Sequence, residues 1–217
     1  MLETDQGNLR SPCMEWSDLQ NARMAMIAML SEKVPGLGRT ALMKLCYFSQ
    51  QLRRVPLGYH FTLYAYGPFD SDVLADLDAV EALGGVKSRL VRYPSTYGYQ
   101  IEAGERSFPV QEAGQEFLEK HRKDMEWVVS EFANLTAADL ELVSTIVYVD
   151  SEIDRVASEG TLSTLVQLVQ DVKPHFTEPQ IRRRAEELLA KGILSHVIAD
   201  FGPSAKSVQT NVQCRGR

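Results

Sequence analysis

Cysteine is scarce in this sequence. Its 217 residues include three cysteines, Cys13, Cys46 and Cys214, which are an odd number and lie far apart. Neither a disulfide framework nor a cysteine-based zinc site is therefore expected. Cys46 falls on the apolar side of a helical pattern, and no His or Asp lies at helical spacing from it. We interpret Cys46 as a small core residue and not as a nucleophile.

Long hydrophobic runs are absent as well. No apolar stretch reaches the roughly 18 to 20 residues of a membrane-spanning helix. The first residues, with Glu3 and Asp5, lack the basic and apolar regions of a signal peptide. Hydrophobic residues make up 44% and charged residues 24% of the chain, which are ordinary values for a globular protein. We expect a cytoplasmic protein without a membrane partner.

Catalytic and cofactor-binding motifs are also missing. The four histidines lie near no recognisable nucleophile motif, and neither G-x-S-x-G nor H-E-x-x-H occurs. His121 has Phe117 and Met125 four residues away on either side, so its helix offers no second metal ligand there. We therefore predict that the chain is no enzyme and needs no metal or cofactor. An enzyme with an unrecognised site is the second alternative, because catalytic groups need not be close in sequence.

The stretch from Arg39 to Phe69 carries most of the information that is present. Apolar residues recur there at steps of three and four, which predicts a helix with one buried side. The residues on that side are Leu42, Leu45, Cys46, Ser49 and Leu52. Residues 61–66 then alternate as in a half-buried strand, which stops at a predicted Gly67-Pro68 turn.

The order of the elements predicts the fold class. We expect a helix over 17–33 before this stretch, and after it a helix that Asp70 or Ser71 caps. A hairpin over 86–93 and 97–101 follows. Further helices are predicted over 111–132, 137–149, 161–172 and 178–191, and the predicted threonine N-caps are Thr40, Thr136, Thr161 and Thr177. The fold class is α+β, mostly α.

The first hundred residues have the element order of a winged helix-turn-helix. We therefore expect a winged-helix-like N-terminal unit with a β-hairpin over residues 16–108, packed on a C-terminal helical bundle over residues 109–199. Residues 1–15 are expected to form a flexible N-terminus, and residues 200–217 a flexible tail.

Charge is distributed unevenly along the chain, whose formal net charge is -6. Residues 33–69 contain bases but no acid, and residues 70–81 contain acids but no base. A winged helix that reads DNA places its third helix in the major groove and needs Arg, Lys, Asn or Gln there. This helix instead carries Asp72, Asp76 and Glu81 on its predicted outer face, where they would repel phosphates. Nucleic-acid binding is therefore the first alternative only, through backbone contacts of Lys87, Arg89 and Arg92.

Two short motifs resemble a known family. Lys44-Leu45-Cys46-Tyr47-Phe48 and, further along, Tyr66-Gly67-Pro68 resemble the Panacea domain family, which includes SocA-like antitoxins and phage-associated proteins, and in particular its YwgA-like members. The resemblance covers residues 21–132. It implies a small α-rich domain that binds a partner protein directly, without catalysis or cofactor. Such relatives neutralise a toxin or deliver a partner to a protease, so a toxin encoded nearby is the implied partner.

Residues 39–69 are rich in tyrosine and arginine and contain no acid, a composition typical of the centres of protein interfaces. This composition favours a protein-binding module over the two alternatives. The predicted partner-binding residues are Lys44, Tyr47, Arg53, Arg54, Tyr64, Tyr66, Gly67, Pro68 and Phe69.

Overall fold

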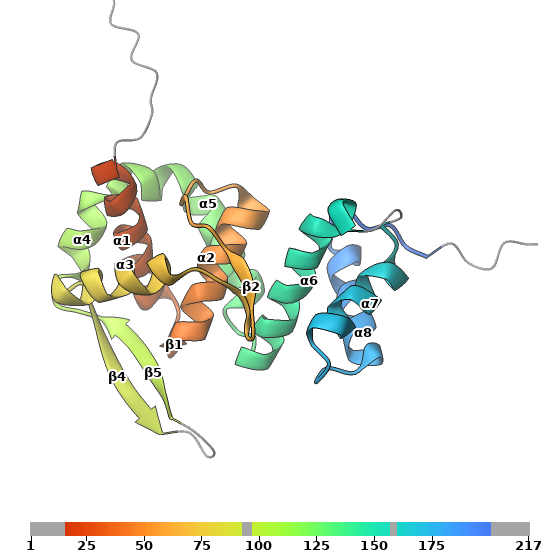
Figure 1. The fold of residues 1–217 in the computed structure, drawn as a ribbon. Coiled ribbons are helices and arrows are strands. Elements are labelled where there is room, and N and C mark those ends of the chain that lie inside the picture. Colours follow the sequence, from red (N-terminus) through yellow and green to blue (C-terminus); the bar gives the residue numbers. More distant parts are fainter. Residues whose placement is uncertain (1–15, 93–96, 157–159, 201–217) are drawn as a thin grey trace, which may run out of the picture. The chain divides into compact units, whose positions relative to one another are not determined.

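The structure is a computed structural model that describes residues 16–92, 97–156 and 160–200 (Figure 1). Over these residues the chain forms eight helices, a three-stranded sheet and a two-stranded hairpin, so the predicted fold class is confirmed. The helices are α1 (Trp16–Lys33), α2 (Arg39–Arg53), α3 (Ser71–Ala82), α4 (Ser107–Ala113), α5 (Gln115–Phe132), α6 (Ala137–Val156), α7 (Leu162–Val172) and α8 (Glu178–Ala190). The strands are β1 (Leu37–Gly38), β2 (Thr62–Tyr64), β3 (Gly67–Phe69), β4 (Val86–Arg92) and β5 (Tyr97–Ala103). A bilayer-spanning helix, which requires a long apolar run, is not found among the described residues.

The three-stranded sheet joins the connection between α1 and α2 to the long hairpin. β1 pairs antiparallel with β5, and β5 pairs antiparallel with β4, which gives the strand order β1-β5-β4. Because α1, α2 and α3 precede the hairpin, this is the topology of a winged helix with β4 and β5 as the wing (Figure 1). Val86 and Ile101 at the base of the wing are buried, whereas Leu90 and Tyr99 further out are exposed.

The segment between α2 and α3 differs from the prediction. It forms a hairpin in which β2 pairs antiparallel with β3, and the chain turns at Ala65 and Tyr66. Gly67 and Pro68 therefore lie in the second strand and not in a turn. Gly67 has a φ of +87°, which glycine adopts without strain, and a proline is compatible with a strand that pairs on one side. Alternation alone does not distinguish one strand over 61–66 from two short strands with a tight turn.

The helix predicted over 111–132 is divided into α4 and α5 at Gly114. A Cβ atom at this position would lie 2.5 Å from the Cβ of Ala25 and 2.8 Å from the carbonyl oxygen of Asn21. The absence of a side chain at Gly114 therefore permits the close approach to α1. The apolar period continues through the break, so the pattern did not predict it.

Several helices begin at their predicted caps. Asp70, Thr136 and Thr161 accept hydrogen bonds from backbone N–H groups in the first turns of α3, α6 and α7. Thr177 forms a capping box with the side chain of the third residue of α8. The prediction is wrong for α2, which begins at Arg39 with Gly38 as its N-cap and without a side-chain cap.

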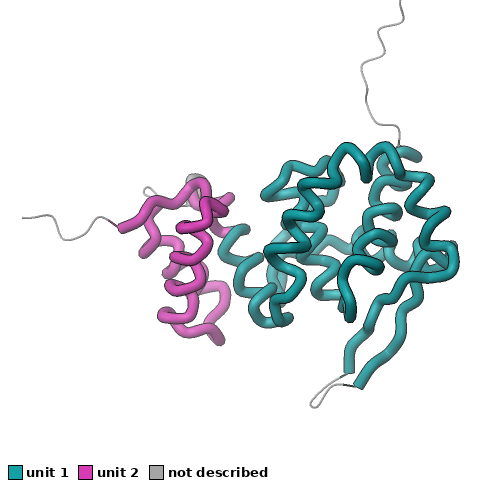
Figure 2. The backbone as a smooth tube through the Cα atoms, turned by 180° about the vertical axis from the view of Figure 1, so that it is seen from behind, with its two compact units in different colours: residues 1–148 teal, residues 149–217 magenta. Residues whose placement is uncertain are grey.

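The chain divides into two compact units, residues 1–148 and 149–217, and the boundary lies within α6 (Figure 2). The predicted boundary at residue 108 is earlier, because the prediction places α4 and α5 in the C-terminal bundle. In the structure α5 packs against α2 within the first unit, and the rings of Phe48 and Phe132 stack with their centroids 4.1 Å apart. α5 therefore belongs to the core of the first unit.

The second unit contains the end of α6, α7, α8 and the segment that ends at Asp200. The carboxylate of Asp150 accepts hydrogen bonds of 3.0 and 3.2 Å from the backbone N–H groups of Ser195 and His196. Hydrogen bonds from Ser163, followed by that from Arg182, hold the pKa of Asp200 below its usual value. Asp200 is thus bound at the start of α7 and is not part of a free tail. The remainder of the predicted tail, like residues 1–15, lies outside the described residues.

Candidate functional site

The residues predicted to bind a partner do not share one surface. The buried ones are Lys44, Tyr47, Gly67 and Pro68. The exposed ones are Arg53, Arg54, Tyr64 and Tyr66, and Phe69 is half-buried. The structure therefore separates residues that shape the fold from residues that a partner can reach.

The buried residues form a junction inside the first unit. Lys44 is 2% exposed, and its Nζ donates a hydrogen bond of 2.6 Å to the carbonyl oxygen of Pro68. A Cβ atom on Gly67 would lie only 2.8 Å from the Oγ of Ser144 and 3.2 Å from the Nζ of Lys44. This junction brings together α2, β3 and the first part of α6. It positions the β2-β3 hairpin but presents no side chain to a partner.

The exposed aromatic residues lie at the turn of that hairpin. We define the hairpin tip as Tyr64, Ala65 and Tyr66, all of which are exposed. Tyr64 is 61% exposed and Tyr66 is 76% exposed. The rings of Tyr64 and Phe69 meet edge to face with their centroids 5.4 Å apart. This contact limits the rotation of the Tyr64 side chain. The tip thus presents two tyrosines on a backbone that the buried junction anchors.

Arg53 is engaged within the fold. Its Nε and Nη2 donate hydrogen bonds of 2.9 and 2.7 Å to Oδ1 of Asp124. Its guanidinium also lies 5.0 Å from the ring centroid of Trp127. Both partners belong to α5, so Arg53 connects the end of α2 to α5. Arg54, which has a φ of 56° and ends α2, keeps an exposed side chain.

The basic residues of the wing are exposed, but two of them lie beside one carboxylate. Arg89 forms an ion pair with Glu102 on the neighbouring strand, and Lys87 lies opposite Glu102 in the register. On α3, Asp72 and Asp78 are exposed. The wing and α3 therefore do not provide the continuous basic surface that backbone contacts to nucleic acid require.

Asp76, predicted on the outer face of α3, is instead buried in a polar cluster. Its Oδ2 accepts a hydrogen bond of 2.9 Å from the hydroxyl of Tyr59 and lies 3.7 Å from Nη1 of Arg23. The guanidinium of Arg23 also lies 4.3 Å from the ring centroid of Tyr59. Burial raises the pKa of Asp76 and also that of Tyr59. Helical spacing did not reveal this, because Arg23 and Tyr59 come from distant parts of the sequence.

Cys46 lies beside the same cluster and is buried. Burial, together with the nearby charge of Asp76, raises the pKa of the Cys46 thiol to about 12. A thiol with this pKa stays protonated at neutral pH and is a poor nucleophile. The arrangement therefore agrees with the core role predicted for Cys46.

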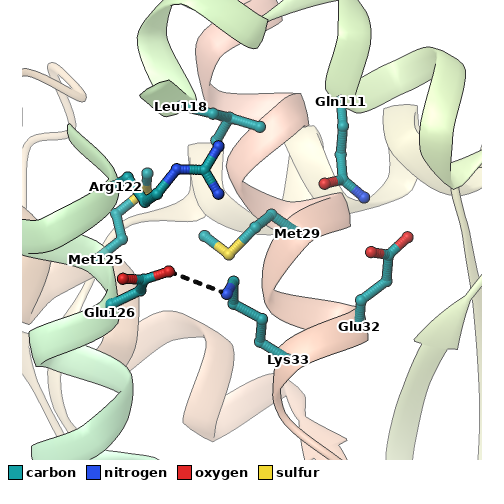
Figure 3. A pocket seen from close by; sticks show the side chains of 8 residues that line it. All are labelled: Met29, Glu32, Lys33, Gln111, Leu118, Arg122, Met125 and Glu126. Atoms are coloured by element: carbon teal, nitrogen blue, oxygen red, sulfur yellow. Dashed lines mark hydrogen bonds and ion pairs between the residues drawn. The ribbon is translucent and has the colours of Figure 1, made fainter. Parts of the chain in front are cut away.

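A small pocket opens between α1 and the helices α4 and α5 (Figure 3). It is lined by Met29, Glu32, Lys33, Gln111, Leu118, Arg122, Met125 and Glu126 and has a volume of about 230 Å³. Lys33 and Glu126 form an ion pair of 3.3 Å at its edge, while Glu32 accepts a hydrogen bond of 2.6 Å from Ser107. Ligand pockets usually measure about 300 to 1,000 Å³, so this one is small. It joins no nucleophile to a base.

The described residues include no group of three or more His, Cys, Asp or Glu side chains placed to hold a metal ion. His121 lies in a partly buried position, which lowers its pKa, and its Nδ1 is 3.9 Å from Oδ2 of Asp124.

No family model and no curated protein matches this chain. The hairpin tip contains the two exposed tyrosines of the predicted binding site, and the exposed Arg53 and Arg54 lie at the end of α2.

Proposed function

We propose that the protein is a binding module that recognises a partner protein through the hairpin tip, without catalysing a reaction. The observation that carries the proposal is the exposure of Tyr64 and Tyr66 at the tip of a hairpin whose second strand begins with the buried residues Gly67 and Pro68. Tyrosine offers a large contact area at a low cost in conformational entropy, and it is enriched among the residues that dominate binding energies.

The anchoring of the hairpin supports this proposal. The hydrogen bond from Lys44 to Pro68 and the close packing around Gly67 hold the second strand of the hairpin directly after its turn. A partner that binds the tip would therefore order little additional backbone, which favours affinity. The acidic exposed residues of α3 favour a protein partner over nucleic acid.

The motif resemblance suggests a role and a kind of partner for such a module. A member of the Panacea domain family with a YwgA-like or SocA-like role would act in the cytoplasm as an antitoxin or a phage-associated accessory protein. Its partner would be a protein, such as a toxin encoded nearby. The inert thiol of Cys46 agrees with binding without covalent chemistry.

The test is a pull-down of the tagged chain from its native cells at physiological salt with nuclease added, followed by titration of the recovered partner. We expect a stoichiometric protein partner whose affinity falls at least about tenfold for the Tyr64→Ser/Tyr66→Ser variant. Phe108→Ser provides the matched control, because Phe108 is 72% exposed and lies on α4.

Two results would contradict the proposal. A tip variant that folds and binds its partner as tightly as the Phe108→Ser control would remove the hairpin tip from the interface. Recovery of nuclease-sensitive material alone would favour the nucleic-acid contact through the wing. Thermal unfolding of both variants shows whether a loss of binding reflects a loss of folding.

A further inference from the structure

A second, larger concave site lies beside the wing, within the first unit. We call it the wing groove. It is lined by residues 34–41, by residues 97–99 of the wing, and by Ala133, Leu135, Ala137 and Leu140 before and within the first turn of α6. Its volume is about 550 Å³. Sites for small organic ligands usually fall between about 300 and 1,000 Å³, so the wing groove has the size of such a site.

The walls of the wing groove are mostly apolar. Leu37 and Leu140 contribute buried side chains, while Tyr97 and Tyr99 are 63% and 42% exposed. Tyr99 lies opposite Leu90, which is 59% exposed, so apolar side chains continue along this face of the wing. A ligand in the groove would cover aromatic surface that the described part of the chain leaves in contact with solvent.

The groove also has a single sign of charge. Arg39 is the one charged residue among the described residues that line it. Its guanidinium stacks over the ring of Tyr99, 3.9 Å from the centroid, and its Nε is buried without a hydrogen-bond partner among the described residues. The stacking fixes the positive charge of the guanidinium at the groove.

The start of α2 adds to this positive potential. Residues 39–41, the first turn of the helix, line the groove, and the turn contains no acidic residue. Gly38, the N-cap, supplies no side-chain acceptor. The partial positive charge of a helix N-terminus therefore points to the same region as the guanidinium of Arg39.

We propose that the wing groove binds a small organic acid that joins one carboxylate to an aromatic or aliphatic body. The carboxylate lies against Arg39 and the first turn of α2, and the body lies against Tyr97 and Leu140. One guanidinium together with one helix N-terminus complements a single negative charge. The apolar walls favour an apolar body over a sugar or a phosphate. The site is separate from the hairpin tip and does not depend on the proposed function.

The test uses the full chain labelled with ¹⁵N and three probe acids: 4-phenylbutyrate, octanoate and indole-3-acetate. Each acid is compared with its primary amide, which has the same body without the charge. We expect at least one acid to shift the backbone amide signals of residues 38–41 and 97–99, and to bind at least tenfold more tightly than its amide. Arg39→Gln should reduce that affinity at least tenfold, while Lys87→Gln, which removes an exposed charge from the other face of the wing, should not.

Three outcomes would overturn the proposal. The first is equal binding of acids and amides, which would leave Arg39 and the helix N-terminus without a role. The second is the absence of shifts at the groove for all three acids at millimolar concentration. The third is tighter binding of an apolar tripeptide with a free carboxyl terminus than of any probe acid, which would assign the groove to a polypeptide end.

Tyr97→Ala, at an exposed position, tests the groove independently if Arg39→Gln fails to fold. Unchanged affinity of the probe acid for that variant would also contradict the proposal.

Discussion

The Nζ of Lys44 donates a hydrogen bond of 2.6 Å to the carbonyl oxygen of Pro68, and the lysine is 2% exposed. These residues belong to the two motifs that the sequence singles out, and they meet across 24 positions of the chain. A buried ammonium group is costly unless its hydrogen bonds are satisfied. One residue of each motif therefore takes part in an internal contact that holds the β2-β3 hairpin.

The first prediction concerns this contact. Lys44→Met removes the donor and leaves the carbonyl oxygen of Pro68 buried without it, so the free energy of unfolding should fall by about 1 to 3 kcal/mol. Urea unfolding followed by circular dichroism measures the change. Lys33→Met is the control, because Lys33 pairs with Glu126 in a largely exposed position and should change stability by less than about 1 kcal/mol. Equal stabilities of the two variants would show that the buried bond is not important.

The second prediction separates backbone strain from steric overlap. Gly67→Ala and Gly36→Ala both place a side chain at positive φ, +87° and +73°. Only at Gly67 would the new Cβ overlap with its surroundings, at 2.8 Å from the Oγ of Ser144, whereas the nearest atom at Gly36 is 3.8 Å away. Gly36→Ala should lower the free energy of unfolding by about 1 kcal/mol, and Gly67→Ala should lower it by clearly more. Thermal unfolding of the two variants in parallel gives the comparison, and a smaller loss for Gly67→Ala would contradict the packing seen at the junction.

The third prediction concerns pH. Folding raises the pKa of Asp76 above 3.8, mainly through burial. A folded state that holds this proton more tightly has the full stabilising contribution below pH 3.8 and loses it as the pH rises through the folded pKa. Asp76→Asn keeps an oxygen acceptor for Tyr59 but does not ionise. The stability of the variant relative to the natural chain should therefore increase as the pH rises from about 4 to about 7.

Urea unfolding at several pH values in that range measures this difference. Asp78→Asn removes an exposed carboxylate from the same helix and serves as the control. A constant difference between Asp76→Asn and the natural chain, or one that decreases with pH, would mean that burial is not the dominant influence on Asp76.

The fourth prediction uses the thiol of Cys46. In a Cys13→Ser/Cys214→Ser variant, Cys46 is the only cysteine left. Because burial raises its pKa to about 12, iodoacetamide at mildly alkaline pH should label the native protein far more slowly than the protein unfolded in urea. Mass spectrometry over time gives both rates. Rapid native labelling would identify an accessible, reactive thiol and would reopen the question of covalent chemistry.

The features that the sequence predicted correctly are local ones. The helices over residues 17–33, 161–172 and 178–191, the wing hairpin, and the caps Asp70, Thr136 and Thr161 follow from residues within a few positions of one another. Side-chain periodicity and capping chemistry operate over that range, so a single sequence contains them. The α+β, mostly α fold class follows from the same local patterns.

The tertiary structure decided which of the predicted binding residues are accessible. Both Tyr47 and Tyr66 were predicted to bind a partner, but Tyr47 is 2% exposed and Tyr66 is 76% exposed. The wing groove around Arg39 was not predicted either, since its walls come from three separate stretches of the chain.

Composition, local period and caps therefore determined most of the helices of this protein, the wing hairpin and their order along the chain. The division of its tyrosines between core and surface, the burial of Asp76 against Arg23 and the bond from Lys44 to Pro68 were decided only on folding. The physical reason is that burial and hydrogen bonding depend on which distant segments meet, and local periodicity contains no information about that.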